Sequence, residues 1–87
     1  MTNQDIANYI KDCPHIEHID SIVIGNQRGF ELLTYIVIKL DTIEIRSDIF
    51  DFMEKSDCFE FIVQFVPISL KNRITGKVIF ENGSFAQ

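Results

Sequence analysis

The chain has 87 residues, which is enough for one folded domain and too few for two. A composition of 46% hydrophobic and 24% charged residues, with eight phenylalanines, is that of a folded protein and excludes a disordered chain. The net charge of -5 argues against nucleic acid or an anionic membrane as a partner. The longest apolar run, residues 32–38, is far shorter than the ~20 residues that span a bilayer.

The first expected element is a helix over residues 3–13. Thr2 or Asn3 is its expected cap, and apolar residues then recur at helical spacing. Pro14 stops this pattern because it cannot continue a helix.

Two strands are expected next. Residues 19–24 are rich in β-branched side chains, Gly25–Gly29 has the composition of a turn, and Phe30–Leu40 is the clearest strand of the chain. The short link predicts an antiparallel hairpin. Both faces of the second strand are largely apolar, so we expect a central strand that helices cover on one side.

The pattern after Leu40 predicts a second helix and two further strands. Asp41-Thr42 breaks the strand, Ile43–Ile45 is expected as a strand end or a loop, and the helix is expected to open at Ser47-Asp48. A strand follows over residues 59–66 and ends at Pro67, and residues 77–80 are expected to form a short strand.

From Glu81 onward we expect a polar tail, and we find no internal repeat. The expected fold is therefore α+β, as a single domain over residues 1–87. It has a small three-stranded, mainly antiparallel sheet with two helices packed on one face, plus a short C-terminal strand.

The number of cysteines indicates the kind of cellular compartment in which the chain folds. Cys13 and Cys58 are too few for a disulfide framework, and the sequence contains no secretory pattern. We therefore expect buried free thiols in a reducing cytoplasm.

Basic residues gather near the C-terminal end of the chain. Residues 1–70 hold five basic and twelve acidic side chains, whereas Lys71, Arg73 and Lys77 fall within a stretch that contains no acid. Gly76 allows the backbone to turn or to approach another surface closely, and Lys77 then presents a compact positive charge. A glycine-lysine pair by itself most often marks a solvated turn.

The order of these features resembles the C-terminal subdomain of the AMP-forming adenylating enzymes, which include acyl-CoA synthetases, peptide-synthetase adenylation domains and luciferases. The features are Cys13-Pro14-His15-Ile16 after the first helix, Gly25 closing a strand, Phe65-Val66-Pro67, and Thr75-Gly76-Lys77-Val78. The resemblance covers residues 3–80. Within the superfamily, we consider the phenylacetate-CoA ligase branch as the nearer relative.

The resemblance implies that Lys77 is catalytic, placed between a substrate carboxylate and ATP, and that Thr75 and Gly76 bind beside it. It also implies ATP with Mg, and then CoA or pantetheine, bound in complex with a large N-terminal adenylating domain in cis or in trans. The sequence departs from the usual loop at Lys71, where a proline is typical, and at Arg73, near the usual threonine. Without the proline, we expect a less stiff loop.

The chain has four isolated glycines and no glycine-rich phosphate loop, so we expect no catalysis and no bound cofactor from the chain alone. It is either a fragment of a longer ligase or a free-standing version, and the residues leave both open. The expected role is that of a mobile lid.

Three other residue groups suggest chemistry, and each has a simpler interpretation. Cys13, His15 and His18 are of types that bind zinc, but no second ligand pair accompanies them, so we expect no metal. The helical acidic cluster is interpreted as a solvated face, and the aromatic series as core rather than a stacking platform for bases. The acidic cluster comprises Asp48, Asp51, Glu54 and Asp57, and the aromatic series Phe50, Phe52, Phe59, Phe61 and Phe65.

Two alternative functions remain open. One is a small non-catalytic regulatory or dimerisation module of the amino-acid-sensing type, which would form a homodimer through a sheet edge but requires a strand before the first helix. The other is an adaptor that has kept the fold of the adenylating subdomain and lost its chemistry.

Overall fold

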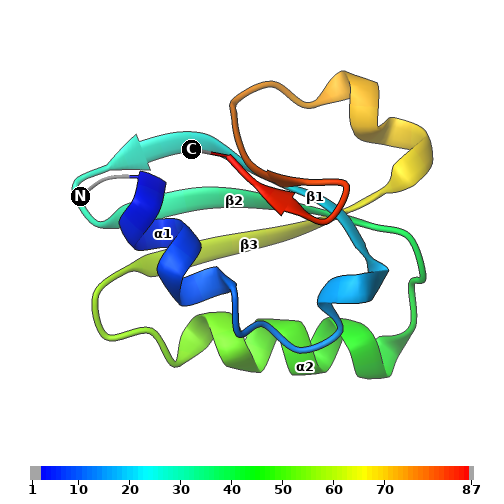
Figure 1. The fold of residues 1–87 in the computed structure, drawn as a ribbon, viewed down its shortest axis with the longest axis horizontal. Helices are drawn as coiled ribbons and strands as arrows, with labels where there is room; N and C mark the ends of the chain where they lie inside the picture. Colours follow the sequence, from blue (N-terminus) through cyan, green and yellow to red (C-terminus); the bar gives the residue numbers. More distant parts are fainter. Residues whose placement is uncertain (1–2, 87) are drawn as a thin grey trace.

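The computed structural model describes residues 3–86, which form two helices and a five-stranded sheet (Figure 1). The helices are α1 (Asn3–Ile10) and α2 (Ile43–Glu54), and the strands are β1 (Ile19–Arg28), β2 (Glu31–Ile38), β3 (Glu60–Pro67), β4 (Lys77–Glu81) and β5 (Ser84–Phe85). Two short 3-10 segments are η1 (Ile16–His18) and η2 (Ile68–Arg73). The expected α+β class is confirmed.

The sheet is larger than expected and mixed in direction. Its strand order is β3-β2-β1-β4-β5, with β2 and β3 parallel and every other neighbouring pair antiparallel. The expectation of a three-stranded, mainly antiparallel sheet was therefore wrong in detail. Because α2 returns the chain to the end of the sheet where β2 began, β3 lies parallel to β2.

The β1–β2 hairpin turns later than the composition indicated. β1 continues to Arg28, and only Gly29 and Phe30 form the turn. Gly25 lies at a register shift within the strand, where an added Cβ would be 2.5 Å from Cε2 of Tyr35. This glycine serves close packing at a β-bulge rather than a turn.

Helix α2 begins one turn earlier than expected. The side chain of Thr42 caps it by accepting a hydrogen bond of 3.1 Å from the backbone N–H of Ile45. Ile43 and Ile45 therefore belong to the first helical turn, and their alternation with Glu44 does not mark a strand end or a loop.

The end of the chain also differs from expectation. The expected strand at 77–80 is confirmed as β4, but the residues after Glu81 form a second hairpin rather than a polar tail. Asn82 and Gly83 take positive φ values of 51° and 83° and reverse the chain. The ring of Phe85 then packs at 4.9 Å from that of Phe80.

The core lies between the sheet and a layer made by both helices. Ile6 and Ile10 of α1, together with Ile49 and Met53 of α2, belong to the same buried cluster as the inward side chains of β1 and β2. The ring of Tyr9 lies 4.7 Å from Phe52 and 5.7 Å from Phe61, which links the two helices to β3. The expected arrangement of two helices on one face is therefore present, and η2 contacts β2 and β3.

The aromatic series packs as core with one exception. Phe61 is buried, and Phe52, Phe59 and Phe65 pack against the core, but the ring of Phe50 is 42% exposed.

The two cysteines differ in burial. Cys13 is buried, and burial raises the pKa of its thiol to about 12. Cys58 is exposed, so the expectation that both thiols are buried was wrong. The reason is that Cys58 lies in the connection between α2 and β3, outside the helical layer.

No helix among residues 3–86 is long and apolar enough to cross a membrane.

Candidate functional site

Lys77 is the first residue of β4, where its backbone pairs with Ile24 of β1. Its side chain is exposed and forms no ion pair with any residue between 3 and 86. The ammonium group is thus free, while the backbone that carries it is held by the sheet.

Gly76 brings the loop into direct backbone contact with β1. Its φ is 150°, and an added Cβ would lie 2.4 Å from the carbonyl oxygen of Ile24 and 2.9 Å from Cα of Gly25. No side chain fits in that space, so glycine is required for the close approach. This contact sets the position of the residue that follows, Lys77.

Thr75 and Gly76 line a shallow cleft of about 400 Å³ between the end of η2 and the sheet. The cleft also contains the hydroxyl of Ser21, which is buried and has no hydrogen-bond partner in the described part of the chain. The charged residues on its lining are Lys71 and Glu81.

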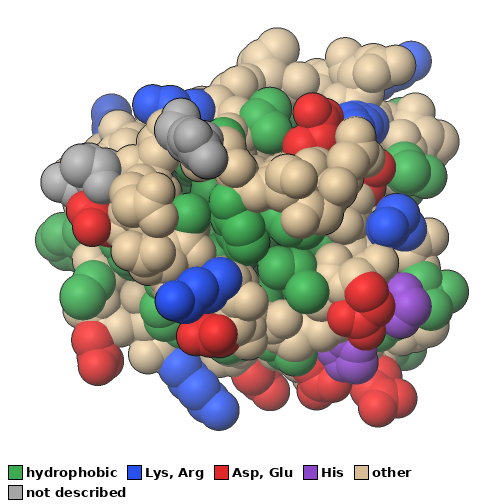
Figure 2. Space-filling view, viewed as in Figure 1, with side chains coloured by type: hydrophobic (Ala, Val, Ile, Leu, Met, Phe, Trp, Pro, Cys, Tyr) green, Lys and Arg blue, Asp and Glu red, His purple; other side chains and the backbone are tan. Residues whose placement is uncertain are grey.

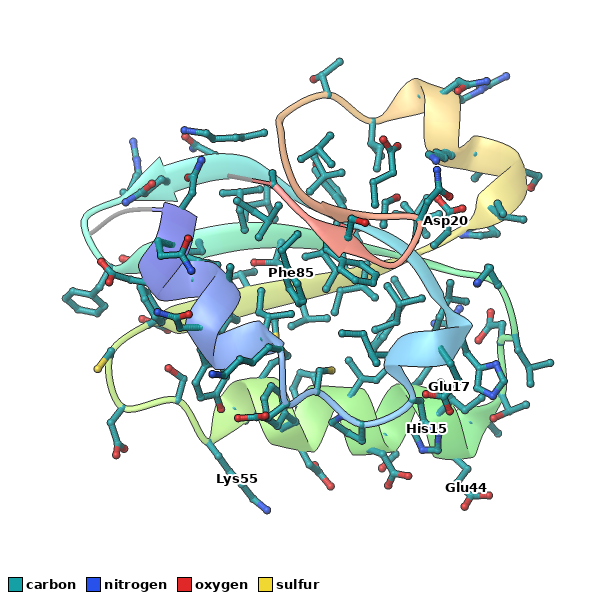
Figure 3. The ribbon with its side chains drawn as sticks, viewed as in Figure 1. His15, Glu17, Asp20, Glu44, Lys55 and Phe85 are labelled. Atoms are coloured by element: carbon teal, nitrogen blue, oxygen red, sulfur yellow. The ribbon has the colours of Figure 1, made fainter. Side chains whose placement is uncertain are left out.

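Lys71 fastens the loop to the sheet. Its Nζ lies 2.7 Å from Oδ2 of Asp20 and 3.1 Å from Oε2 of Glu81, and these two carboxylates raise the pKa of the lysine. The side chain of Asp20 is only 10% exposed, and Figure 3 shows it beneath the segment that contains η2. The residue that stands in place of the proline is held by ion pairs to β1 and β4, and the lower stiffness of the loop stays a prediction.

The electrostatics of the cleft do not favour a nucleotide. The one cation on its lining is matched by two carboxylates, those of Asp20 and Glu81. A triphosphate placed there would meet net negative charge. What the arrangement can do is hold Lys77 outward for contact with another molecule.

The three residues considered as metal ligands are used otherwise. Nε2 of His15 lies 2.7 Å from Oδ2 of Asp48, which fixes the loop before η1 against α2 (Figure 3). Nε2 of His18 lies 3.7 Å from Oε1 of Glu17, and the raised pKa of Cys13 disfavours the thiolate that binds metal. Within residues 3–86, no group of three potential ligands is placed to hold a metal ion.

Asp48, Asp51 and Glu54 lie on α2, where Figure 2 shows acidic side chains along the lower border of the face, whereas Asp57 follows the end of the helix, so the expectation that all four share one helix face was wrong for Asp57. The side chain of Asp48 contacts His15 and is still 46% exposed.

Sequence reasoning placed Thr75, Gly76 and Lys77 together but missed the Asp20–Lys71–Glu81 ion pairs. One signal was available: Asp20 is the only charged residue within the apolar run 19–24. A lone carboxylate in a buried strand requires a cation, but the chain pattern does not say which one.

Comparisons with known protein families, with curated proteins and with solved structures give no match for this chain.

Proposed function

We propose that this chain is the mobile lid subdomain of an AMP-forming acid–thiol ligase. In this role it delivers Lys77 to a carboxylate and ATP held by a separate, large adenylating domain. The observation that carries the proposal is the free ammonium of Lys77 on an anchored backbone, beside a loop whose other flanking lysine is neutralised. The order of elements and the Thr75-Gly76-Lys77 segment support the same assignment.

The chemistry explains why a lysine is needed at this point. Formation of an acyl-adenylate brings a carboxylate to the α-phosphate of ATP, and negative charge spreads over the phosphoryl oxygens in the transition state. An ammonium that loses its water on docking stabilises this charge, and such a contact can contribute ~3–4 kcal/mol in a water-poor site. Because Gly76 and the β1 pairing fix the backbone, only the rotamer freedom of the Lys77 side chain is lost when Lys77 docks.

The partner supplies everything else. In this proposal the adenylating domain, joined in cis or provided in trans in the cytoplasm, binds the acid and ATP with Mg. The lid then rotates so that CoA or a pantetheine thiol can attack the adenylate, a domain motion of the hinge type. When Lys77 is in place, Thr75 and Gly76 would lie beside a nucleotide that the adenylating domain binds, and not one bound in their own cleft.

A regulatory module of the amino-acid-sensing type remains the alternative. It requires a strand before the first helix, and in residues 3–86 the first element is α1. Its dimerisation component has a specific structural basis in the outer edge of β3, which no strand of residues 3–86 covers.

The test is ATP–pyrophosphate exchange by the chain together with its adenylating domain, either as one polypeptide or as the domain that co-purifies with it. We expect Lys77→Ala to reduce exchange by about 10²–10³-fold, because one transition-state charge contact is lost. Circular dichroism and urea unfolding should stay unchanged, because Lys77 has no partner within the described chain.

The matched control is Lys55→Ala. It removes the same charge from an exposed lysine that points away from the protein at the end of α2 (Figure 3), and it should leave exchange unchanged. Undiminished exchange with Lys77→Ala would exclude the proposed role, as would an adenylating domain whose rate does not respond to this chain.

A further inference from the structure

The outer edge of β3 is open, and the strand carries no charged side chain beyond Glu60 at its start. β3 is the last strand in the order, and no strand of residues 3–86 pairs with its outer side. Residues 61–67 contain no charged side chain, whereas natural edge strands are usually protected by charges, bulges or short length. The opposite edge follows that rule, because it ends in the two-residue strand β5.

The hydrogen-bonding groups on this edge follow from the pairing with β2. The backbone N–H of Glu60 donates to the carbonyl of Phe30, so the even-numbered residues of β3 direct their backbone groups toward β2. Phe61, Val63 and Phe65 therefore direct theirs outward. These three residues thus offer backbone N–H and C=O groups that no strand of residues 3–86 uses, and the series ends at Pro67 because proline lacks an N–H.

Helix α2 presents a stripe beside the same edge. Arg46, Phe50 and Glu54 recur every four residues, so they lie on one side of the helix. The guanidinium of Arg46 lies 5.2 Å from the ring centre of Phe65 and donates two hydrogen bonds, of 2.6 and 2.7 Å, to the carboxylate of Asp41. Phe50 and Glu54 line a groove of about 620 Å³ with Phe61 and Val63. Along β3 the stripe thus presents an arginine that is paired with Asp41, an exposed phenyl ring and a carboxylate.

This stripe matches a reversed copy of itself. If two β3 strands pair antiparallel about a two-fold axis at Val63, Phe61 lies opposite Phe65 of the second copy. The helical stripes then also run in opposite directions. Arg46 comes to Glu54 of the second copy, and the two Phe50 rings meet at the centre.

We propose that the chain forms a homodimer through the outer edge of β3, with the two sheets joined into one. The occupant of the edge is a second copy, because the two-fold register sets the exposed Phe50 against Phe50 and brings Glu54 to an arginine that has only one carboxylate, that of Asp41, within its own chain. The one acid on the strand does not oppose this register. Glu60 lies opposite Val66, so the two Glu60 side chains are ~20 Å apart and screened at physiological salt.

The dimer is independent of the proposed lid function. β2 and β1 separate β3 from β4, so the seam leaves Lys77 free. Either proposal can therefore fail without the other.

The first test is oligomeric state by sedimentation equilibrium over a range of concentrations. We expect the wild-type chain to dimerise reversibly. Arg46→Glu and Glu54→Arg should each raise the dimer dissociation constant about tenfold, since each places like charges across the seam. The double variant should return toward the wild-type value, and that recovery would not occur if Arg46 served only its ion pair with Asp41.

The strand itself is tested by Ile62→Lys, which adds a charge at a 46%-exposed position on the edge and should abolish the dimer. Val78→Lys, at a 39%-exposed position on β4, is the matched control and should leave the dimer intact. The proposal is overturned if the wild-type chain stays monomeric up to its solubility limit, including the case in which it pairs only with a different protein.

The register is tested with a spin label on Cys58, the exposed thiol, while buried Cys13 stays unlabelled. Pairing about Val63 places the two labels at opposite ends of the seam, ~30 Å apart. A dimer with labels in close contact would have a different interface and would overturn the proposal.

Discussion

At the scale of single residues, the position of the loop before Lys77 depends on the absence of a Cβ atom at Gly76. Gly76 lets the backbone rest on Ile24 and Gly25 at distances that a Cβ would not allow. The partner position on β1 is also a glycine, and the ring of Tyr35 packs against it. The site is therefore positioned by backbone contact, and the lysine side chain stays free for other uses.

We predict that Gly76→Ala lowers the free energy of unfolding by about 2–3 kcal/mol, because the new Cβ meets fixed backbone atoms at a strained φ. Urea unfolding followed by circular dichroism measures the loss. Gly29→Ala is the matched control: its φ is 60° and nothing lies within 4 Å of an added Cβ, so the cost should be about 1 kcal/mol. Equal losses in the two variants would contradict the close contact.

At the scale of elements, the N-cap at Thr42 makes residues 43–45 helical although their alternation of apolar and polar residues is typical of a strand. The Ile-Glu-Ile alternation favours a strand, but the hydroxyl of Thr42 satisfies a backbone N–H at the helix start. With the cap at residue 42, Ile45, Ile49 and Met53 fall on the buried side of the helix.

We predict that Thr42→Ala lowers the free energy of unfolding by about 1 kcal/mol, the usual cost of losing an N-cap. Ser47→Ala, at the residue that sequence reasoning took as the helix start, should change it by less than about 0.5 kcal/mol, because Ser47 is exposed within the helix. Thermal or urea unfolding compares the two. A larger loss at residue 47 would place the helix start where the sequence pattern indicated.

The second element-scale feature is the clamp that Lys71 forms with Asp20 and Glu81. It joins η2 to β1 and β4. It also gives the nearly buried carboxylate of Asp20 a cationic partner, without which burying this charge would destabilise the fold. The cleft side of the loop is thus fixed from two strands.

We predict that Lys71→Ala destabilises the protein and increases amide exchange and proteolysis in residues 68–76. Arg73→Ala, the matched control, should do neither, because Arg73 is exposed and forms no ion pair with residues 3–86.

The pH dependence of this effect has a definite sign. The pKa of Lys71 is raised in the folded state above its ordinary value of 10.5, so its contribution is complete below pH 10.5. It is lost as the pH rises through the folded pKa. The stability difference between the wild type and Lys71→Ala should therefore shrink in strongly alkaline buffer, and a difference that grew there would contradict the clamp.

At the scale of the whole molecule, most of the chain is negatively charged, and basic side chains gather in residues 71–77. The net charge is -5, and two carboxylates neutralise Lys71 at the cleft. In this part of the chain, therefore, only the exposed Arg73 and Lys77 are available to an anion. We predict that the chain alone binds no ATP–Mg in isothermal titration calorimetry at physiological salt. Micromolar binding by the isolated chain would contradict a lid that relies on its partner for the nucleotide.

Much of the fold follows from local patterns. The spacing of apolar residues in α1, the β-branched run in β1 and the proline at the end of β3 act through neighbouring residues, so the types and order of these elements could be predicted. The expected site residues Thr75, Gly76 and Lys77 adjoin one another for the same reason, since they are consecutive in the chain.

Other features depend on residues far apart in the sequence. An α+β domain with a cationic loop near its C-terminal end follows from the sequence alone, because periodicity and composition are properties of short segments. The packing of the folded chain, in contrast, pairs β3 parallel to β2 with an open edge and brings Lys71 to Asp20 from 51 positions away. It also leaves the side chain of Lys77 without an ion pair among residues 3–86. These outcomes depend on which surfaces pack together, and the local sequence of a strand or loop does not specify which distant segment it will contact.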